Sequence, residues 1–507
     1  MNKFIIITIL ALSAFTSSCS NFEELNTDPN AATKVNASML ATSSILNITR
    51  QGGNKYFLWY AMISKHISWW EGALEEQYNR FGRTSFGTYS SLIDGLKMIE
   101  VAEEKDKDVY TALFKFLKAY KLFYLSLEVG DIPYSEALKG ETENIITPKY
   151  DTQKDVMLQV LGDLEEAYEL FGTSKHFDGD PIFNGDTQKW RKAAVAMQLK
   201  VLIHLSKKAD DSDLKVKERF NKLLSSGALM ESNDDNLQLV YANAAGQVYP
   251  LHYTQTNHAG YGMVSNLVID NMKKFEDYRM FYYCSPAKYQ LNKGVSASEW
   301  DAYMSVDPSD FFPNIATMAS EGKYCAFNAR YTQRPEGEPL IRLGYAEQNF
   351  ILAEAALRGW INKDASVYYK KAIKGSMNFV AKYTPNEAIY NHGRLITDEY
   401  IDKYINSDVI QLKGGFEEQL EQIMLQRYLA SFIQHPYDSY YDYRRTGYPI
   451  LPINPETNMN TEKDKIPMRW MYPDSEFSFN ADNANAAVER QYGGSDNVNK
   501  LMWILQD

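Results

Sequence analysis

The chain has 507 residues, of which 45% are hydrophobic and 23% charged, and its formal net charge is −12. This composition is typical of a folded globular protein and excludes a largely disordered chain. The negative charge argues against nucleic acid or an anionic lipid surface as a partner. Only three cysteines are present, which excludes a disulfide framework as the basis of the fold.

The N-terminal residues have the organisation of a secretory signal. A charged start precedes an apolar run over residues 4–15, and the small hydroxyl residues 16–18 lead to Cys19. The run is too short to span a bilayer. A cysteine at the cleavage point predicts a bacterial lipoprotein with Cys19 as its lipid anchor, and an ordinary secreted protein is the alternative. We expect residues 1–18 to be the lipoprotein signal peptide and residues 19–34 to be a polar, lipid-anchored tether.

Helical periodicity dominates the chain beyond the tether. Apolar residues recur every three or four positions in 107–129, 157–171 and 190–205, which predicts three helices with one apolar face each. Residues 345–360 and 364–383 form two further helices joined by a short break. Their small residues and tight turn are typical of tetratricopeptide-like pairs. The sequence therefore predicts a mainly α fold in which several helix pairs form a scaffold.

Two long stretches lack this periodicity. Residues 227–330 and 446–507 are rich in glycine, asparagine, aspartate and proline. Long irregular segments on a rigid frame are where binding surfaces tend to lie. We expect a single domain over residues 35–507, with these two stretches as loop-rich insertions into the helical scaffold.

No catalytic motif or metal motif stands out. The chain lacks the metalloprotease, nucleophile-elbow and phosphate-loop patterns. His252 and His258 are near neighbours but have no third ligand nearby, so we expect neither a metal nor a cofactor. The sequence leaves open whether Cys284 and Cys325 pair or stay as separate buried thiols. A pair of carboxylates can hydrolyse glycosides, and the chain has 65 acidic residues, none of which the sequence singles out. A secreted or surface all-α glycoside hydrolase is therefore the alternative function.

Aromatic residues give the better lead to a binding site, and residues 56–89 are especially rich in them. Aromatic faces match the apolar faces of sugar rings and peptide side chains, while tyrosine and tryptophan edges form hydrogen bonds. On one helix, Trp59 and Trp70 would share a face, whereas the adjacent Trp69 and Trp70 must point in different directions. The candidate ligand-binding residues in this stretch are Trp69, Trp70, Tyr78, Arg80, Phe81 and Tyr89.

A second group of candidates lies in the first loop-rich stretch. Trp300 and Tyr303 follow a segment rich in glycine and serine, and we expect them to face the first group across a cleft. Tyr261 is a weaker member of the same set. Packing in the core is an equally good interpretation for at least half of these aromatic residues, and the sequence does not decide between the two.

Seven segments of the mature chain together carry a resemblance to one family. They are residues 21–33 (NFEELNTDPNAAT), 130–138 (GDIPYSEAL), 150–167, 184–208, 346–360, 437–451 and 466–487. Each segment alone is only modestly similar to the family, but the order and spacing of all seven make a chance match very improbable. The chain resembles the SusD/RagB nutrient-binding outer-membrane lipoproteins, in the starch-binding-associated subgroup.

The resemblance implies a SusD-like fold with four tetratricopeptide-like helix pairs and a loop-rich lobe that carries the ligand site. It also implies a binding protein rather than an enzyme, anchored by lipid to the outer membrane and facing the extracellular side. Such proteins capture an oligosaccharide or oligopeptide and deliver it to a SusC-like TonB-dependent transporter. The sequence does not decide between the two ligand classes.

Overall fold

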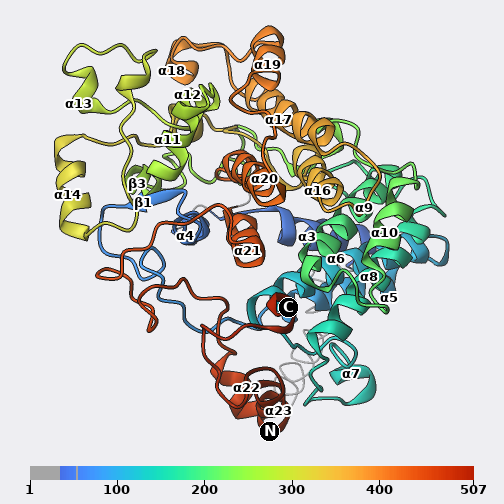
Figure 1. Cartoon of the computed structure of the whole chain (residues 1–507). Coiled ribbons are helices and arrows are strands. Elements are labelled where there is room, and N and C mark those ends of the chain that lie inside the picture. Colours follow the sequence, from blue (N-terminus) through green and yellow to red (C-terminus); the bar gives the residue numbers. More distant parts are fainter. Residues whose placement is uncertain (1–34, 53–54, 435) are drawn as a thin grey trace, which may run out of the picture.

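The computed structural model describes residues 35–52, 55–434 and 436–507. The expected signal peptide, tether and Cys19 lie outside these residues. Helices account for about half of the described molecule, and its strands are few and short (Figure 1). The fold is mainly α, as the periodicity predicts.

Eight helices form the scaffold, and they follow one another along the chain as four pairs that also pack across the pair boundaries. Three of the four pairs lie on the right and upper parts of Figure 1, with α21 near the centre beside α20. The pairs are α6 (Lys107–Val129) with α8 (Gln153–Phe171), α9 (Thr187–His204) with α10 (Val216–Leu224), α16 (Tyr345–Leu357) with α17 (Ala365–Lys382), and α20 (Phe416–Ala430) with α21 (Pro436–Thr446).

Local signals set the ends of these helices. The Thr152 side chain accepts a hydrogen bond from the Asp155 backbone amide and caps α8, while Asp186 caps α9 in the same way. Gly130 ends α6 with a φ of 94°, a conformation that side chains with a Cβ rarely adopt. The predicted helices therefore begin and end close to the expected residues.

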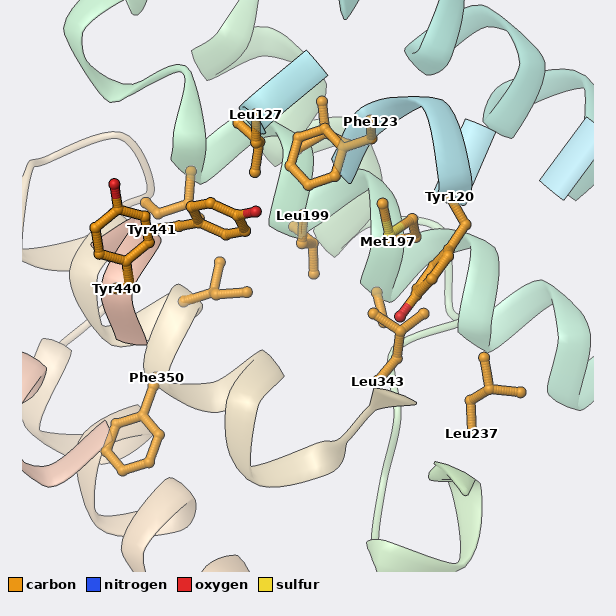
Figure 2. Packing of buried hydrophobic residues seen from close by; sticks show 14 of the residues in the cluster. Tyr120, Phe123, Leu127, Met197, Leu199, Leu237, Leu343, Phe350, Tyr440 and Tyr441 are labelled. Atoms are coloured by element: carbon orange, nitrogen blue, oxygen red, sulfur yellow. The ribbon is translucent and has the colours of Figure 1, made fainter. Parts of the chain in front are cut away.

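The core forms where the scaffold helices meet two short strands. Figure 2 shows side chains from α6, α9 and α21 around a common interior, with Tyr120 of α6 directed toward β4 (Leu340–Leu343). The residues drawn from these elements are buried and belong to one continuous apolar cluster. They include Phe123, Leu127, Met197, Leu199, Leu343, Phe350, Tyr440 and Tyr441.

Two short antiparallel strand pairs fasten the loop-rich lobe to the scaffold. β1 (Ile67–Trp69) pairs with β3 (Gly262–Val264), and β2 (Leu237–Leu239) pairs with β4. The lobe occupies the left side of Figure 1, where short helices alternate with irregular chain. These helices are α11 (Asn266–Lys274), α12 (Arg279–Tyr283), α13 (Lys288–Leu291), α14 (Phe312–Glu321) and α15 (Ala329–Thr332).

Eight further α-helices of the described chain lie outside the four scaffold pairs and the lobe. Two of these helices, α22 (Asp474–Phe479) and α23 (Ala481–Tyr492), belong to the C-terminal stretch at the bottom of Figure 1. The other six are α3 (Ala37–Thr49), α4 (Tyr56–Ile63), α5 (Ile93–Val101), α7 (Gly140–Glu143), α18 (Ala388–Asn391) and α19 (Asp398–Ile405).

The chain between α4 and β1 corrects one expectation from the sequence. Helix α4 ends at Ile63, so the prediction that Trp59 and Trp70 share one helical face is wrong. The Ser64 hydroxyl donates to the Tyr60 carbonyl, and Lys65 then adopts a left-handed φ of 61°. This turn stops the helix and directs the chain into β1.

Both cysteines beyond the tether are buried as free thiols. Burial raises the pKa of the Cys284 thiol well above its ordinary value, and its contact with Cys325 acts in the same direction. The structure therefore shows two neighbouring buried thiols, of which Cys284 is protonated.

Candidate functional site

The structure divides the nine candidate residues among separate places. Trp69, Trp70 and Tyr261 lie together, because β1 pairs with β3 and Tyr261 immediately precedes β3. The Tyr261 ring lies 5.4 Å from Trp69 and 5.1 Å from Trp70. Trp69 is fully buried, whereas Trp70 and Tyr261 are half-buried. Of the three, Trp70 and Tyr261 are the ones that present surface to a ligand.

Tyr78 and Tyr89 use their hydroxyl groups to hold the chain. The Tyr78 hydroxyl donates to the Asp310 carbonyl at 3.0 Å, and the Tyr89 hydroxyl donates to the Pro133 carbonyl at 2.6 Å. Burial raises the pKa of Tyr78 to about 12 and that of Tyr89 well above its ordinary value. Both phenols are therefore neutral and already engaged as donors.

Trp300 and Tyr303 belong to a third place. Both rings pack on Phe281, with centroid distances of 4.7 Å and 4.9 Å. Tyr303 is buried and donates its hydroxyl to the Ala297 carbonyl. Among the described residues, no ring contact joins this cluster to Trp69, Trp70 or Tyr261. The expectation that the two groups face each other across a cleft stays a prediction.

Arg80 and Phe81 line a cleft of about 600 Å³. Its size is within the range of roughly 300–1,000 Å³ that is usual for ligand sites. The cleft lies between α4, the segment 75–88, the C-terminal half of α6 and the chain at Trp470. Its principal lining side chains are Trp59, Tyr60, Glu75, Glu76, Arg80, Phe81, Arg83, Thr84, Thr88, Lys121, Tyr124, Glu128 and Trp470.

A buried lysine fixes the segment that forms one wall of this cleft. Lys65 donates from Nζ to the Gln77 carbonyl and, at 2.8 Å, to Oδ1 of Asn79, which itself has a left-handed φ of 62°. The Gln77 side chain in turn accepts from the Trp69 amide at 2.7 Å. The turn at 77–79 is thereby tied to β1, and Arg80 and Phe81 follow it into the cleft.

The same segment is paired with the chain that carries Trp470. The Met471 amide donates to the Gly82 carbonyl, and the Thr84 amide donates to the Met471 carbonyl. This pairing places the Phe81 ring on Trp470, with centroids 4.7 Å apart and planes inclined by 23°. Phe81 is buried and Trp470 is half-buried, so the indole supplies an aromatic surface to the cleft with the phenyl ring behind it.

Ion pairs compensate the arginine charges on this wall. Arg80 pairs with Glu75 at 2.8 Å, and Arg83 pairs with Asp474 at 2.7 Å and Asp496 at 3.0 Å. The Arg80–Glu75 pair is well exposed to solvent, so it contributes little to the stability of the fold. Both side chains can therefore reorganise around a ligand.

Helix α6 provides the opposite wall, with polar groups on an otherwise apolar helix. Burial raises the pKa of Glu128 to about 7, and its carboxylate accepts a hydrogen bond from the Thr84 hydroxyl. Burial lowers the pKa of Lys121 to about 8, and its ammonium donates to Ser91 at 2.6 Å and to Asn47. The cleft thus combines aromatic surface, hydroxyl groups and ionisable groups near neutrality.

Sequence reasoning missed Lys121, Tyr124, Glu128 and Trp470. Lys121 and Glu128 are seven residues apart, which places them on one face of α6. Two charged residues on one stripe of a helix that is largely buried were the available signal. Trp470 has no comparable signal, because its position against Phe81 depends on pairing between segments almost 400 residues apart.

The described part of the chain shows no group of three or more acidic, histidine or cysteine side chains with metal-site geometry. His252 instead bonds Thr254 at 2.8 Å, and His258 lies beside Trp69 with ring centroids 6.2 Å apart. The chemistry that the cleft offers is non-covalent recognition of a ligand with both apolar faces and hydroxyl groups.

Comparison with known proteins identifies the family. A family model described as SusD-like, starch-binding associating with outer membrane, matches residues 29–473. The chain belongs to this SusD-like family. Members of the family are nutrient- and carbohydrate-binding proteins that associate with the outer membrane. In the described residues of this chain, no helix combines the length and apolar character needed to cross a membrane.

Solved structures agree along almost the whole length. A SusD homologue from Bacteroides fragilis is 57% identical, with a TM-score of 0.91, over 93% of this chain and 100% of the other. An outer-membrane protein from Bacteroides vulgatus, described in connection with nutrient binding, is 32% identical with a TM-score of 0.84 over the same shares. A chitin-binding protein at 22% identity and a TM-score of 0.72 shares the fold. No curated protein matches the chain.

Proposed function

We propose that this SusD-like protein is a lipid-anchored, non-enzymatic binder on the cell surface that captures an oligosaccharide and delivers it to a SusC-type TonB-dependent transporter. Family membership supports the nutrient-binding role and the outer-membrane location. The lipoprotein signal pattern with Cys19 supports the anchor. An oligopeptide is the competing ligand class.

The observation that carries the proposal is the composition of the cleft of about 600 Å³. An indole backed by Phe81 offers the flat apolar surface that sugar rings stack on, and Thr84, Thr88 and Glu128 offer partners for sugar hydroxyls. Asp474 and Asp496 already hold Arg83, so hydroxyl groups and aromatic surface make up most of what the wall formed by 75–88 offers a ligand.

Calorimetric titration with maltoheptaose and chitohexaose tests the ligand class and the site together. Trp470→Ala should weaken binding by about tenfold or more, since loss of a stacking surface costs on the order of 1.4 kcal/mol. Trp70→Ala is the matched control, because it removes a half-buried indole from the other aromatic surface. Loss of binding in Trp70→Ala alone would move the site to the Trp70–Tyr261 surface predicted from sequence.

Two further measurements address the remaining parts of the proposal. Chromatography of the recovered glycan should show it unchanged, and cleavage that depends on one carboxylate would replace the binding function by hydrolysis. Labelling with palmitate should occur in the wild type and disappear in Cys19→Ala, and a large outer-membrane barrel should co-purify with the anchored protein. Binding of peptides in place of both glycans would change the ligand class.

A further inference from the structure

A second cavity of about 230 Å³ adjoins the cleft. The two share Tyr60, Thr88, Lys121, Tyr124 and Glu128, so a ligand in the cleft can extend one group into the cavity. The other lining residues come from the end of α3 and the two residues after it, from α6, from β4 and from α21. An excess of cations distinguishes this cavity from the cleft: Arg50, Lys121 and Arg342 line the cavity with Glu128 as its single lining acid, whereas acids and cations are equal in number in the cleft.

Arg342 is the central feature of the cavity. It lies on β4 and only 7% of its surface is exposed. Its hydrogen bonds run from Nη2 to the Thr49 carbonyl at 3.2 Å and to Oε1 of Gln51 at 3.3 Å. Within the described ranges, Nε has no hydrogen-bond partner and no carboxylate pairs with the guanidinium. A buried guanidinium with unused donors is costly in the absence of an anion.

Neither of the other two cations has an acidic partner in the described chain. Lys121 donates to the neutral side chains of Asn47 and Ser91, and Arg50 donates to the Gly246 carbonyl at 3.0 Å. Three cations thus converge without a paired carboxylate in a protein whose net charge is −12. The two Arg side chains have planar donor forks suited to a carboxylate, and Lys121 adds a third donor.

Glu128 does not neutralise this group of cations. Its side chain bonds the Thr84 hydroxyl, on the side of the cleft, and burial raises its pKa to about 7. Among the residues that line the cavity, one acid therefore stands against three cations, and the nearby Asp438 carboxylate is paired with Lys200. The surrounding hydroxyls of Tyr120 and Tyr437, which lie 3.4 Å apart, add neutral hydrogen-bonding groups for the rest of a sugar unit.

We infer that this cavity is an anion subsite that takes the carboxylate of an acidic sugar unit, presented by an oligosaccharide that occupies the adjoining cleft. The inference rests on the proposed glycan binding and adds a preference for uronate-containing chains. Arg342 forms the bidentate contact, Lys121 contacts the second oxygen at the junction with the cleft, and Arg50 closes the cavity from solvent.

Titration of the mature protein with tetragalacturonate and with its methyl ester tests the subsite, because the two differ only in the carboxylates. The acid should bind at least about tenfold more tightly than the ester, with a preference that shrinks at high salt. Lys121→Gln and Arg342→Lys should each reduce the preference several-fold, and Glu128→Gln should retain or increase it. Lys97→Gln, which removes the same charge from an exposed lysine outside the cavity, should leave it unchanged.

Equal affinity for acid and ester, or a preference that survives in both Lys121→Gln and Arg342→Lys, would overturn the inference. Maltoheptaose separates this failure from failure of the proposed function. Binding of maltoheptaose without any preference for tetragalacturonate over its ester leaves glycan capture intact and removes the anion subsite. If no glycan binds, both proposals are wrong.

Discussion

Buried cations meet acids in the helical scaffold but meet neutral groups around the cleft. In the scaffold, Lys200 of α9 is fully buried between Glu347 at 2.8 Å and Asp438 at 2.9 Å. These acids belong to α16 and α21, so the lysine joins three helices. Paired charges of this kind specify how helices meet, although they add little net stability compared with apolar packing.

Around the cleft the arrangement is different. Lys65, Lys121 and Arg342 donate their hydrogen bonds to backbone carbonyls, amides and hydroxyls rather than to carboxylates. The pKa values follow: burial lowers that of Lys65 to about 7 and that of Lys121 to about 8. Lys65 lies behind the cleft, but Lys121 and Arg342 line the cleft and the cavity without an acidic partner in the described chain, which is the pattern expected of a site that binds a ligand.

The largest effect is expected from breaking a scaffold pair. Glu354 accepts hydrogen bonds from Arg445 and from Arg358, and these cations hold its pKa at about 2 despite burial. Glu354→Gln leaves the Arg445 charge undercompensated in the interior. We expect the free energy of unfolding to fall by about 3–5 kcal/mol, measured by urea denaturation.

An exposed ion pair provides the control for that variant. Glu100 pairs with Lys97 on the surface of α5, and Glu100→Gln should change the free energy of unfolding by less than about 1 kcal/mol. Equal losses in the two variants would show that burial does not separate scaffold pairs from surface pairs.

The segment held by Lys65 should respond to pH in a higher window than the scaffold acid Glu354, whose lowered pKa makes stability rise with pH only under acidic conditions. The folded pKa of Lys65, about 7, is below its unfolded value of 10.5, so the unfolded state binds more protons between these pH values. Stability should therefore rise with pH in this window, by up to about 1.4 kcal/mol per pH unit. Urea denaturation across the window should show a flatter profile for Lys65→Met.

Nearby Asp307 opposes the lowering of the Lys65 pKa, and Lys121 titrates in the same window. The difference between wild type and Lys65→Met isolates the contribution of Lys65 from theirs. Parallel profiles would mean that Lys65 keeps its proton in the folded protein throughout this window, with a pKa close to its unfolded value.

The scaffold could be predicted from sequence far better than the cleft. The helix expected at residues 107–129 has the same bounds as α6, because a helix packed on one side needs apolar residues at every third or fourth position. The segment after α4 has no such periodicity. Lys65 and Asn79 adopt left-handed conformations that depend on a hydrogen bond between them, and no periodicity predicts a contact of that kind.

The candidate ligand-binding residues also show what the sequence does not predict. Sequence reasoning identified aromatic residues by type, but burial decides which of them can touch a ligand. Trp69 is fully buried, while its neighbour Trp70 is half-buried, and only the register of β1 on β3 separates the two. Arg342 gave no signal either, because a single arginine in the segment LIRL is as compatible with an exposed strand as with a cavity.

The smallest change in stability is expected for Arg342, and it tests most directly whether buried cations without an acidic partner differ from those of the scaffold. Arg342→Met removes a buried charge that has no acidic partner, together with two hydrogen bonds to Thr49 and Gln51. The lost hydrogen bonds and the relieved cost of burying the charge act in opposite directions. The free energy of unfolding should therefore change by less than about 1 kcal/mol, whereas Arg445→Met, which leaves Glu354 and Asp442 without that cation, should lose about 3 kcal/mol or more. Equal losses in the two arginine variants, measured by urea denaturation, would mean that Arg342 stabilises the fold in the same way as the scaffold cations. The distinction between cations that are paired with acids and cations that are available to a ligand would then not hold.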